Sequence, residues 1–315
     1  MYYLGIDLGG TNIAAGIVNE KMELVYKTSI PTEAKGGPEH VIDRMAQVAR
    51  AAVKGADLQW SQIKSIGIGT PGAVIPETGV VIYAANLGFK HTPLAQLMAA
   101  KFPGIPVRVE NDANVAAWAE AKCGAAVGTK NSITVTLGTG VGGGMIINGA
   151  LYSGFNNLGG ELGHAVIVEN GRPCGCGRKG CWEAYASVSG LIATTREAME
   201  QNPDSLMWKL AGSLDKVNGL TSFEAMRRGD PAAKQVVDSY LDSVACGVVN
   251  LCNMLQPEVL CIGGGISKEG DTLLKPVQEY VMREMFSRFH TEYTQIKIAK
   301  LGNDAGIIGA ALLGA

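Results

Sequence analysis

Long basic runs are absent from this 315-residue sequence, and charged residues of both signs make up only 18% of it. The formal net charge is −2 at pH 7. Without a basic stretch, the chain has no electrostatic feature that would attract a nucleic-acid backbone. Nucleic-acid binding is therefore not expected, and an anionic substrate would need a local binding site.

Segments that direct a chain into or across a membrane are also missing. The opening MYYLGIDLGG lacks the basic stretch followed by an apolar stretch that is typical of a signal peptide. The most apolar tail, residues 305–315, is far shorter than the roughly 20 residues that a membrane-spanning helix needs. We therefore expect a cytoplasmic protein that has no membrane partner.

Two common nucleotide-binding motifs do not occur. There is no G-x-x-x-x-G-K-[ST] sequence, which excludes a P-loop, and no G-x-G-x-x-G leads from a first strand into a helix. Instead, glycine-rich turns follow strand-like runs at residues 9–12, 138–140 and 263–265. Such turns expose backbone N–H groups that suit phosphate oxygens, although a single one is equally typical of a tight hairpin. Three of them favour a nucleotide site.

A disulfide framework is a poor explanation for the seven cysteines, because the count is odd and no export signal precedes them. Three of them, Cys174, Cys176 and Cys181, lie within eight residues, and His164 precedes them in HAVIVENGRPCGCGRKGC. Three thiols and one imidazole meet the tetrahedral Cys₃His requirement of zinc. We predict a structural Zn²⁺ site here. The other four cysteines have apolar neighbours and are expected in the core: Cys123, Cys246, Cys252 and Cys261.

The length and composition favour an ordered α/β protein with two lobes, since 47% of the residues are hydrophobic and 42 are glycine. Two segments, residues 3–19 and 133–148, each read as a β-hairpin around a glycine turn, and an offset of 129 residues aligns Leu8-Gly9 with Leu137-Gly138. This weak repeat implies two related lobes.

Periodicity places the remaining elements. Apolar residues at helical spacing predict an amphipathic helix over 38–55 and a long helix over 232–255. Residues 107–112, VRVEND, form a strand that runs into a helix-like stretch. We expect one lobe from residues 1–110 plus about 303–315, and a larger lobe from 111–302 that carries the zinc loop 164–181.

Four acidic residues are candidates for a catalytic or binding role, but each has an alternative interpretation. Asp7 ends an apolar strand, where it could face a hydrated Mg²⁺ beside ATP phosphates or simply accept backbone N–H groups. Asp112 precedes a helix, and its local sequence favours a helix cap. Glu161 and Glu183 would be brought together by the zinc loop, which suits either a glycosidase or hydrogen bonds to sugar hydroxyls.

Taken together, the motifs resemble one family from end to end. DLGGTN, GTPG, ENDANVAAWAE, LGTGVGGG, GGELGH, CGCGRKGCWE, IGGGIS and DAGIIGAA resemble the ROK family of bacterial sugar kinases and repressors, within the actin-like ATPase superfamily. The zinc-loop signature CGCGRKGCWE is the most specific of them. Among the members, the chain looks most like the glucokinases.

This resemblance implies a two-lobed, actin-like (ribonuclease H-like) α/β fold with mixed sheets flanked by helices. It further implies an ATP-dependent, homodimeric hexokinase of carbohydrate metabolism that uses ATP, Mg²⁺ and Zn²⁺. The implied reaction phosphorylates the 6-hydroxyl of glucose, with Asp112 as the general base. His164 would ligate zinc together with the three cysteines. The implied hexose contacts are Gly72, Asn86, Asn111, Asp112, Glu161, His164 and Glu183. The implied nucleotide contacts are Asp7, Gly9, Gly10, Thr11, Asn12, Gly138, Thr139, Gly264 and Gly265. Asn12 departs from the lysine that some relatives carry there.

Three rival interpretations stay open at this stage. Family members that are sugar-responsive repressors carry an extra DNA-binding domain, for which this sequence leaves no residues before its first strand at Tyr2. Kinases for N-acetylmannosamine, fructose or allose share the same motifs as the glucokinases. A glycosidase would leave the three glycine turns without a role.

Overall fold

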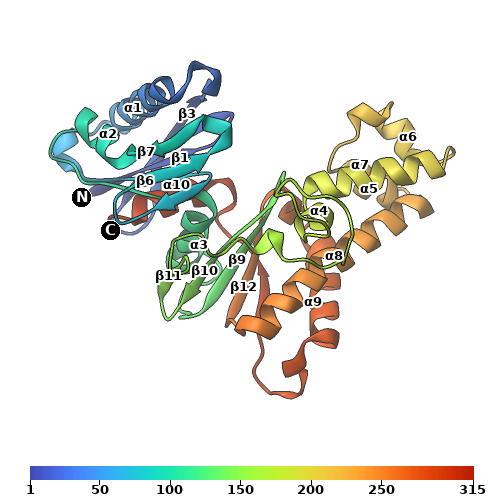
Figure 1. Ribbon diagram of the computed structural model, residues 1–315. Helices are drawn as coiled ribbons and strands as arrows, with labels where there is room; N and C mark the ends of the chain where they lie inside the picture. The colour runs from blue at the N-terminus through green and yellow to red at the C-terminus, as the bar shows by residue number, and fades with distance from the viewer. The chain divides into compact units, whose positions relative to one another are not determined.

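The computed structural model describes residues 1–315, which form two five-stranded mixed sheets flanked by helices (Figure 1). No helix in it combines the length and the apolar character that crossing a membrane would require. The two-lobed α/β class with mixed sheets is the one expected from the sequence.

The first sheet has the strand order β3-β2-β1-β4-β8. β1 runs antiparallel to β2 and β2 antiparallel to β3, whereas β4 pairs in parallel with both β1 and β8. The sheet is covered by helices on both faces, and for that reason β1 and β4 are buried along nearly their whole length. Its strands are β1 (Tyr2–Leu8), β2 (Asn12–Asn19), β3 (Leu24–Pro31), β4 (Ile63–Thr70) and β8 (Val107–Asn111).

The second sheet repeats this plan in the order β11-β10-β9-β12-β13. β10 and β11 are antiparallel and β12 and β13 are parallel, like the corresponding strands of the first sheet. The duplication that the two glycine hairpins predicted is therefore present in the strand order. The strands are β9 (Ser132–Leu137), β10 (Val141–Ile147), β11 (Ala150–Tyr152), β12 (Val259–Gly263) and β13 (Gln295–Ile298).

A third, three-stranded antiparallel sheet is inserted between β4 and β8 in the sequence. It consists of β5 (Ala73–Ile75), β6 (Val80–Ala84) and β7 (Phe89–Thr92), with the short 3₁₀ helix η3 (Ala85–Leu87) between the last two. The sequence analysis did not foresee this sheet. It matters for function because Gly72 directly precedes β5 and Asn86 lies in the connection between β6 and β7.

The two helices expected from periodicity are confirmed. α1 (Pro38–Gly55) starts at the proline and buries its apolar stripe against β1, β2 and β3. α8 (Pro231–Leu255) is capped by Asp230, whose carboxylate accepts the N–H of Ala233 at 2.8 Å, and ends before Pro257. The other helices are α2 (Leu94–Lys101), α3 (Asp112–Cys123), α4 (Glu183–Ala186), α5 (Val188–Gln201), α6 (Leu206–Ala211), α7 (Thr221–Arg227), α9 (Asp271–Glu284) and α10 (Ala305–Leu312).

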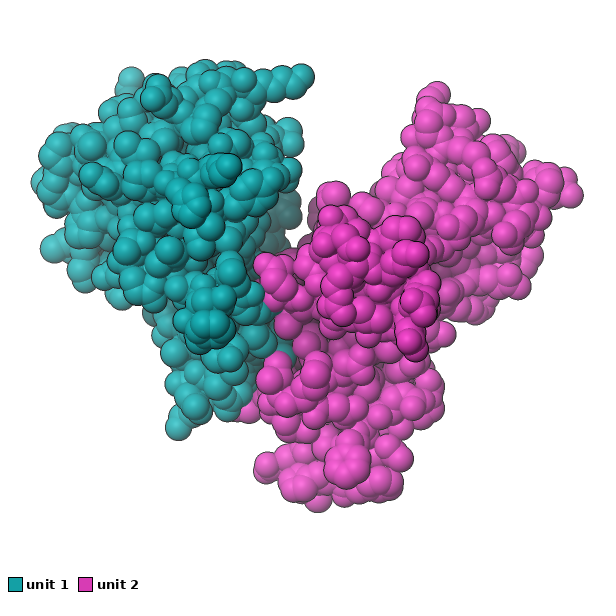
Figure 2. All heavy atoms as spheres, viewed as in Figure 1, with its two compact units in different colours: residues 1–134, 144–160, 300–315 teal, residues 135–143, 161–299 magenta.

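The chain divides into two compact units, coloured separately in Figure 2. The first unit comprises residues 1–134, 144–160 and 300–315, and the second comprises residues 135–143 and 161–299. In the first unit, α10 packs against β1, β2, β4 and α3, so the C-terminal helix belongs to the N-terminal sheet. The lobe boundary near residue 110 stays a prediction.

Candidate functional site

The first glycine turn, residues 9–12, connects β1 to β2. Its backbone is fixed by a hydrogen bond from Gly9 N to Asn12 O (3.0 Å) and by Thr32, which donates its hydroxyl to Gly9 O at 2.6 Å. Gly10, Thr11 and Asn12 are nevertheless exposed. The turn is therefore a tight hairpin connection whose outer surface is open to a ligand. A hairpin turn and a phosphate-binding turn are thus compatible interpretations of its glycines.

Asp7 lies in β1, just before this turn, and is partly buried against α10. A Cβ atom added to Gly306 of that helix would lie 2.6 Å from Asp7 Oδ2. Burial, and then the negative charge of Asp112, raise the pKa of Asp7 to about 6. The negative charge of Asp112 therefore acts on Asp7 within the first unit, and a nearby cation would relieve this repulsion.

Asp112 is the first residue of α3, but the principal cap of this helix is its neighbour Asn111. Asn111 Oδ1 accepts the N–H groups of Ala113 (2.9 Å) and Asn114 (3.2 Å), while Asp112 Oδ1 shares the Ala113 N–H at 2.9 Å. Burial raises the pKa of Asp112, and the hydrogen bond from Ala113 opposes that shift. A carboxylate whose pKa is raised in this way is a stronger base than an exposed one.

Gly72 connects β4 to the inserted sheet and contacts the same corner of the structure. Asn111 Nδ2 donates to Gly72 O at 3.2 Å, so this carbonyl helps to fix the Asn111 side chain. Gly72 has φ +98°, and a Cβ atom there would lie 2.1 Å from Tyr83 O. Only glycine fits this position, both conformationally and sterically.

We expect Gly72→Ala to destabilise the protein by about 3 kcal/mol and to weaken hexose binding, because both the backbone and the Asn111 contact must shift. Gly104→Ala is the matched control: Gly104 also has positive φ (+84°), but a Cβ atom there has no neighbour within 4 Å. The control should cost only about 1 kcal/mol. Urea unfolding and hexose KM measure the difference, and equal effects of the two substitutions would contradict this account.

Asn86 lies in η3, beside the first glycine turn. A Cβ atom added to Gly10 would be 3.4 Å from Asn86 Cβ. The structure therefore places a predicted sugar contact next to a predicted phosphate contact, both within the first unit. The predicted site residues that lie in the first unit are Asp7, Gly9, Gly10, Thr11, Asn12, Gly72, Asn86, Asn111 and Asp112.

In the second unit, the four predicted zinc ligands converge. The ligand atoms of His164, Cys174, Cys176 and Cys181 all lie within 4.8 Å of one another. Cys176 Sγ is 3.6 Å from Cys181 Sγ, and Cys174 Sγ is 3.6 Å from His164 Nδ1. Tetrahedral zinc with bonds of about 2.0–2.3 Å requires ligand atoms roughly 3.5–3.8 Å apart, so the donor set fits the ion.

His164 uses Nδ1 toward the sulfur atoms, and its Nε2 lies 3.9 Å from Glu161 Oε2. The Glu161 side chain is 73% exposed, so its carboxylate is open to a ligand. Glu183 is held differently, because its Oε2 accepts the backbone N–H of Val141 at 2.9 Å. The metal loop thus gathers the three predicted sugar contacts Glu161, His164 and Glu183 within one unit.

The second and third glycine turns are neighbours in this unit. Gly264 has φ +85°, and a Cβ atom there would lie 2.3 Å from Leu137 O, at the end of β9. Gly138 O accepts the N–H of Val188, and Thr139 O accepts the Ser189 hydroxyl at 2.8 Å, which links the second turn to the start of α5. Four predicted nucleotide contacts therefore share one region: Gly138, Thr139, Gly264 and Gly265, the last opening the 3₁₀ helix η6 (Gly265–Glu269).

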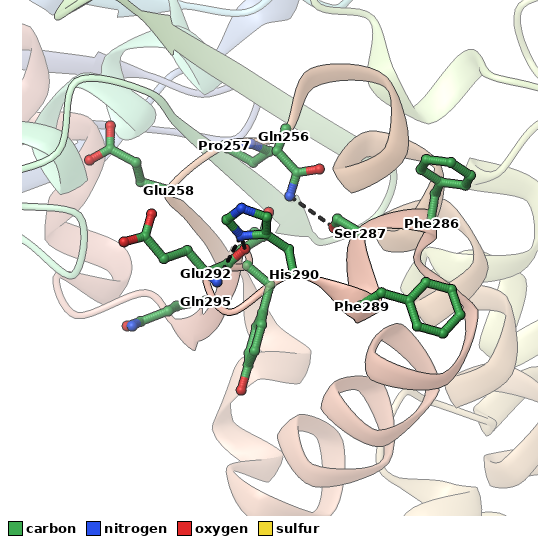
Figure 3. A pocket seen from close by; sticks show the side chains of 11 residues that line it. Gln256, Pro257, Glu258, Phe286, Ser287, Phe289, His290, Glu292 and Gln295 are labelled. Atoms are coloured by element: carbon green, nitrogen blue, oxygen red, sulfur yellow. Dashed lines mark hydrogen bonds between the residues drawn. The ribbon is translucent and has the colours of Figure 1, made fainter.

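A pocket of about 820 Å³ lies elsewhere in the second unit, around the 3₁₀ helix η7 (Phe286–Phe289) (Figure 3). The aromatic side chains of Phe286 and Phe289 are 84% and 85% exposed at its edge. None of the predicted sugar, nucleotide or metal residues lines it. Its volume alone gives it no role in the chemistry considered above.

One polar group beside the site was not foreseen. Glu110, the residue before Asn111, is only 6% exposed. The available signal was a carboxylate within the strand-like stretch VRVEND, since a carboxylate is costly to bury without partners.

Comparison with known proteins agrees with these features. The ROK family model matches residues 3–315. A glucokinase from Halalkalibacterium halodurans is 38% identical over 99% of this chain and 94% of its own length, and a xylose repressor from Caldicellulosiruptor bescii is 28% identical over 97% of this chain and 76% of its own. The crystal structure of a ROK glucokinase from Streptomyces griseus, in complex with glucose and AMPPNP, has a TM-score of 0.85 and 34% identity over 99% of both chains. This chain therefore belongs to the ROK family.

Proposed function

We propose that this protein is an ATP-dependent glucokinase that phosphorylates the 6-hydroxyl of glucose. The observation that carries the proposal is the position of Asp112, a carboxylate with a raised pKa that shares a unit with Asp7 and an exposed glycine turn. Phosphoryl transfer needs a base for the attacking hydroxyl, charge neutralisation and positioning of the phosphates, and these groups could supply all three.

In this proposal Asp112 accepts the proton of the hexose 6-hydroxyl. The proposed hexose contacts, which orient the sugar by hydrogen bonds, are Gly72, Asn86, Asn111, Glu161, His164 and Glu183. The glycine turns at 9–12 and 138–140 receive the phosphates, and Gly264 and Gly265 receive the adenosine. Asp7 faces the hydrated Mg²⁺ that accompanies ATP, which would relieve its interaction with Asp112.

Zinc has a structural role in the proposal. Because His164 and three cysteines fill a tetrahedral set, no position remains for an activated water. The ion would fix His164 through Nδ1 and leave Nε2 free for the sugar. The glucokinase relatives support the choice of substrate, and the S. griseus structure supports ATP as donor.

Three further features remain predictions: homodimeric assembly, a cytoplasmic location, and lobes of residues 1–110 plus about 303–315 and 111–302. The family resemblance motivates the homodimer, the sequence pattern of the N-terminus motivates the location, and the glycine-hairpin repeat motivates the lobe boundary. The dimer is the easiest to test, since light scattering gives the mass of the assembly directly.

A hexose panel tests the function. We expect ADP release with glucose at a kcat/KM at least about tenfold above that with fructose, allose or N-acetylmannosamine. 6-Deoxyglucose, which lacks the attacking hydroxyl, should release no ADP above background. A different preferred hexose would favour a kinase for that hexose. No turnover with any hexose would favour a repressor-like sugar-binding protein, an alternative that the similarity to a xylose repressor supports.

A further inference from the structure

Glu110 is a buried carboxylate at the end of β8, directly before the proposed base. β8 is the edge strand of the first sheet, so the N–H groups on its outer side have no strand partner. Such a group must find another acceptor when it is buried. Glu110 supplies one, because its Oε1 accepts the N–H of Asn111 at 2.8 Å.

The same oxygen holds the first turn of the helix that follows. Asn114, which is 5% exposed, donates its side-chain Nδ2 to Glu110 Oε1 at 3.0 Å. Burial raises the pKa of Glu110, and these two hydrogen bonds oppose the shift. Glu110 Oε1 therefore accepts hydrogen bonds from the backbone of Asn111, the residue before Asp112, and from the side chain of Asn114, two residues after it.

Asn111 connects these hydrogen bonds of Glu110 to Asp112, the proposed base. Its backbone is held by Glu110, and its side chain caps α3 and donates to Gly72 O. With both ends of Asn111 fixed, the peptide that leads into Asp112 has little freedom to rotate. A carboxylate that must meet one particular hydroxyl gains from such restriction, since small displacements of a reacting group are costly.

We propose that Glu110 is a positioning residue that acts through Asn111 and Asn114 to hold Asp112 in its reactive geometry. The inference rests on the proposed kinase function. Glu110 itself does not contact the reacting atoms and only orders the strand-to-helix corner. It is a role separate from the base and from the sugar contacts.

The experiment compares Glu110→Ala and Glu110→Gln with a matched control, Glu120→Ala. Glu120 is a fully buried carboxylate toward the other end of α3, where it accepts the N–H groups of Ala125, Lys300 and Leu301. Each alanine variant removes a buried carboxylate acceptor, Glu110 from β8 beside the start of α3 and Glu120 from α3 itself, and should lower the unfolding temperature. Steady-state kinetics for glucose and ATP are measured well below that temperature.

We expect Glu110→Ala to lower kcat by about 10- to 100-fold with less than about a threefold change in the KM for ATP. Glu110→Gln keeps the acceptor oxygen and should stay within about threefold of wild type. Glu120→Ala should lose stability but keep its kcat within about threefold. If Glu110→Ala does not fold, Glu110→Asp, which withdraws the acceptor by one methylene, gives the same comparison.

The inference is overturned if folded Glu110→Ala turns over glucose like wild type, or if Glu110→Ala and Glu120→Ala lose kcat to the same extent. Failure of the proposed function looks different, because the wild-type protein itself would then release no ADP with any hexose. In that case both proposals fall together.

Discussion

Replacing Asp112 with asparagine should lower kcat for glucose phosphorylation by about 10²- to 10⁴-fold while the protein still folds. Asparagine keeps an oxygen that can accept the Ala113 N–H, but it cannot accept the proton of the 6-hydroxyl. Because the lost interaction belongs to the transition state, glucose affinity should change much less than kcat. Single-turnover kinetics and glucose titration calorimetry measure the two quantities separately.

Asp271→Asn is the matched control, since Asp271 is also the first residue of a helix, α9, and is exposed. It should leave kcat unchanged. A folded Asp112→Asn protein that phosphorylates glucose within a few-fold of wild type would leave helix capping as the better explanation of this residue, and the proposed mechanism would be abandoned.

The pH dependence of stability tests the effect of Asp112→Asn independently of its activity. The pKa of Asp112 is raised in the folded state, chiefly by burial, so the ionised side chain costs stability above that pKa. That cost is relieved as the pH falls through the folded pKa toward the unfolded value. Asp112→Asn removes the buried charge and should therefore unfold at no lower temperature than wild type at pH 8, in spite of its lost activity.

Replacing Cys176 with alanine should remove the bound zinc, lower the unfolding temperature by roughly 5–10 °C, and reduce kcat/KM for glucose by about 10²-fold. Removing one of the four ligands opens the tetrahedral set, and without the ion the Nδ1 atom of His164 keeps only its contact with Cys174 Sγ. Glu161 and Glu183 flank the same loop, so sugar binding and metal content should fall together. Elemental analysis, thermal unfolding and glucose titration check the three effects.

Cys246→Ala is the control, because Cys246 is a partly exposed cysteine of α8 that lies outside the metal cluster. It should keep about one zinc per chain and near-normal activity. The predicted zinc site would be contradicted if wild-type protein contained no zinc yet were fully active. It would also be contradicted if Cys176→Ala kept its metal content.

Local sequence patterns were sufficient wherever the controlling interactions are short-range. α1 and α8 followed from apolar residues at helical spacing, and the zinc set followed from three cysteines and a histidine on one short loop. The duplicated sheets were indicated by two similar glycine hairpins, because a hairpin needs only its own turn and strands. The Cys252 and Cys261 side chains are buried as expected, whereas Cys123 and Cys246 are partly exposed.

Only the tertiary structure decided what depends on distant partners. The inserted sheet β5–β7 gave no periodic signal because its strands are short. Gly72 directly precedes this sheet, and Asn86 lies between its second and third strands. Asn111 rather than Asp112 supplies most of the α3 cap because Gly72, 39 residues earlier, fixes its side chain. The burial of Glu110 is offset by its hydrogen bond from an N–H group at the sheet edge, and burial together with Asp112 raises the pKa of Asp7 to about 6. A sequence states which groups are present, whereas burial and charge proximity, which set their chemistry, arise only when strands from separate parts of the chain are packed together.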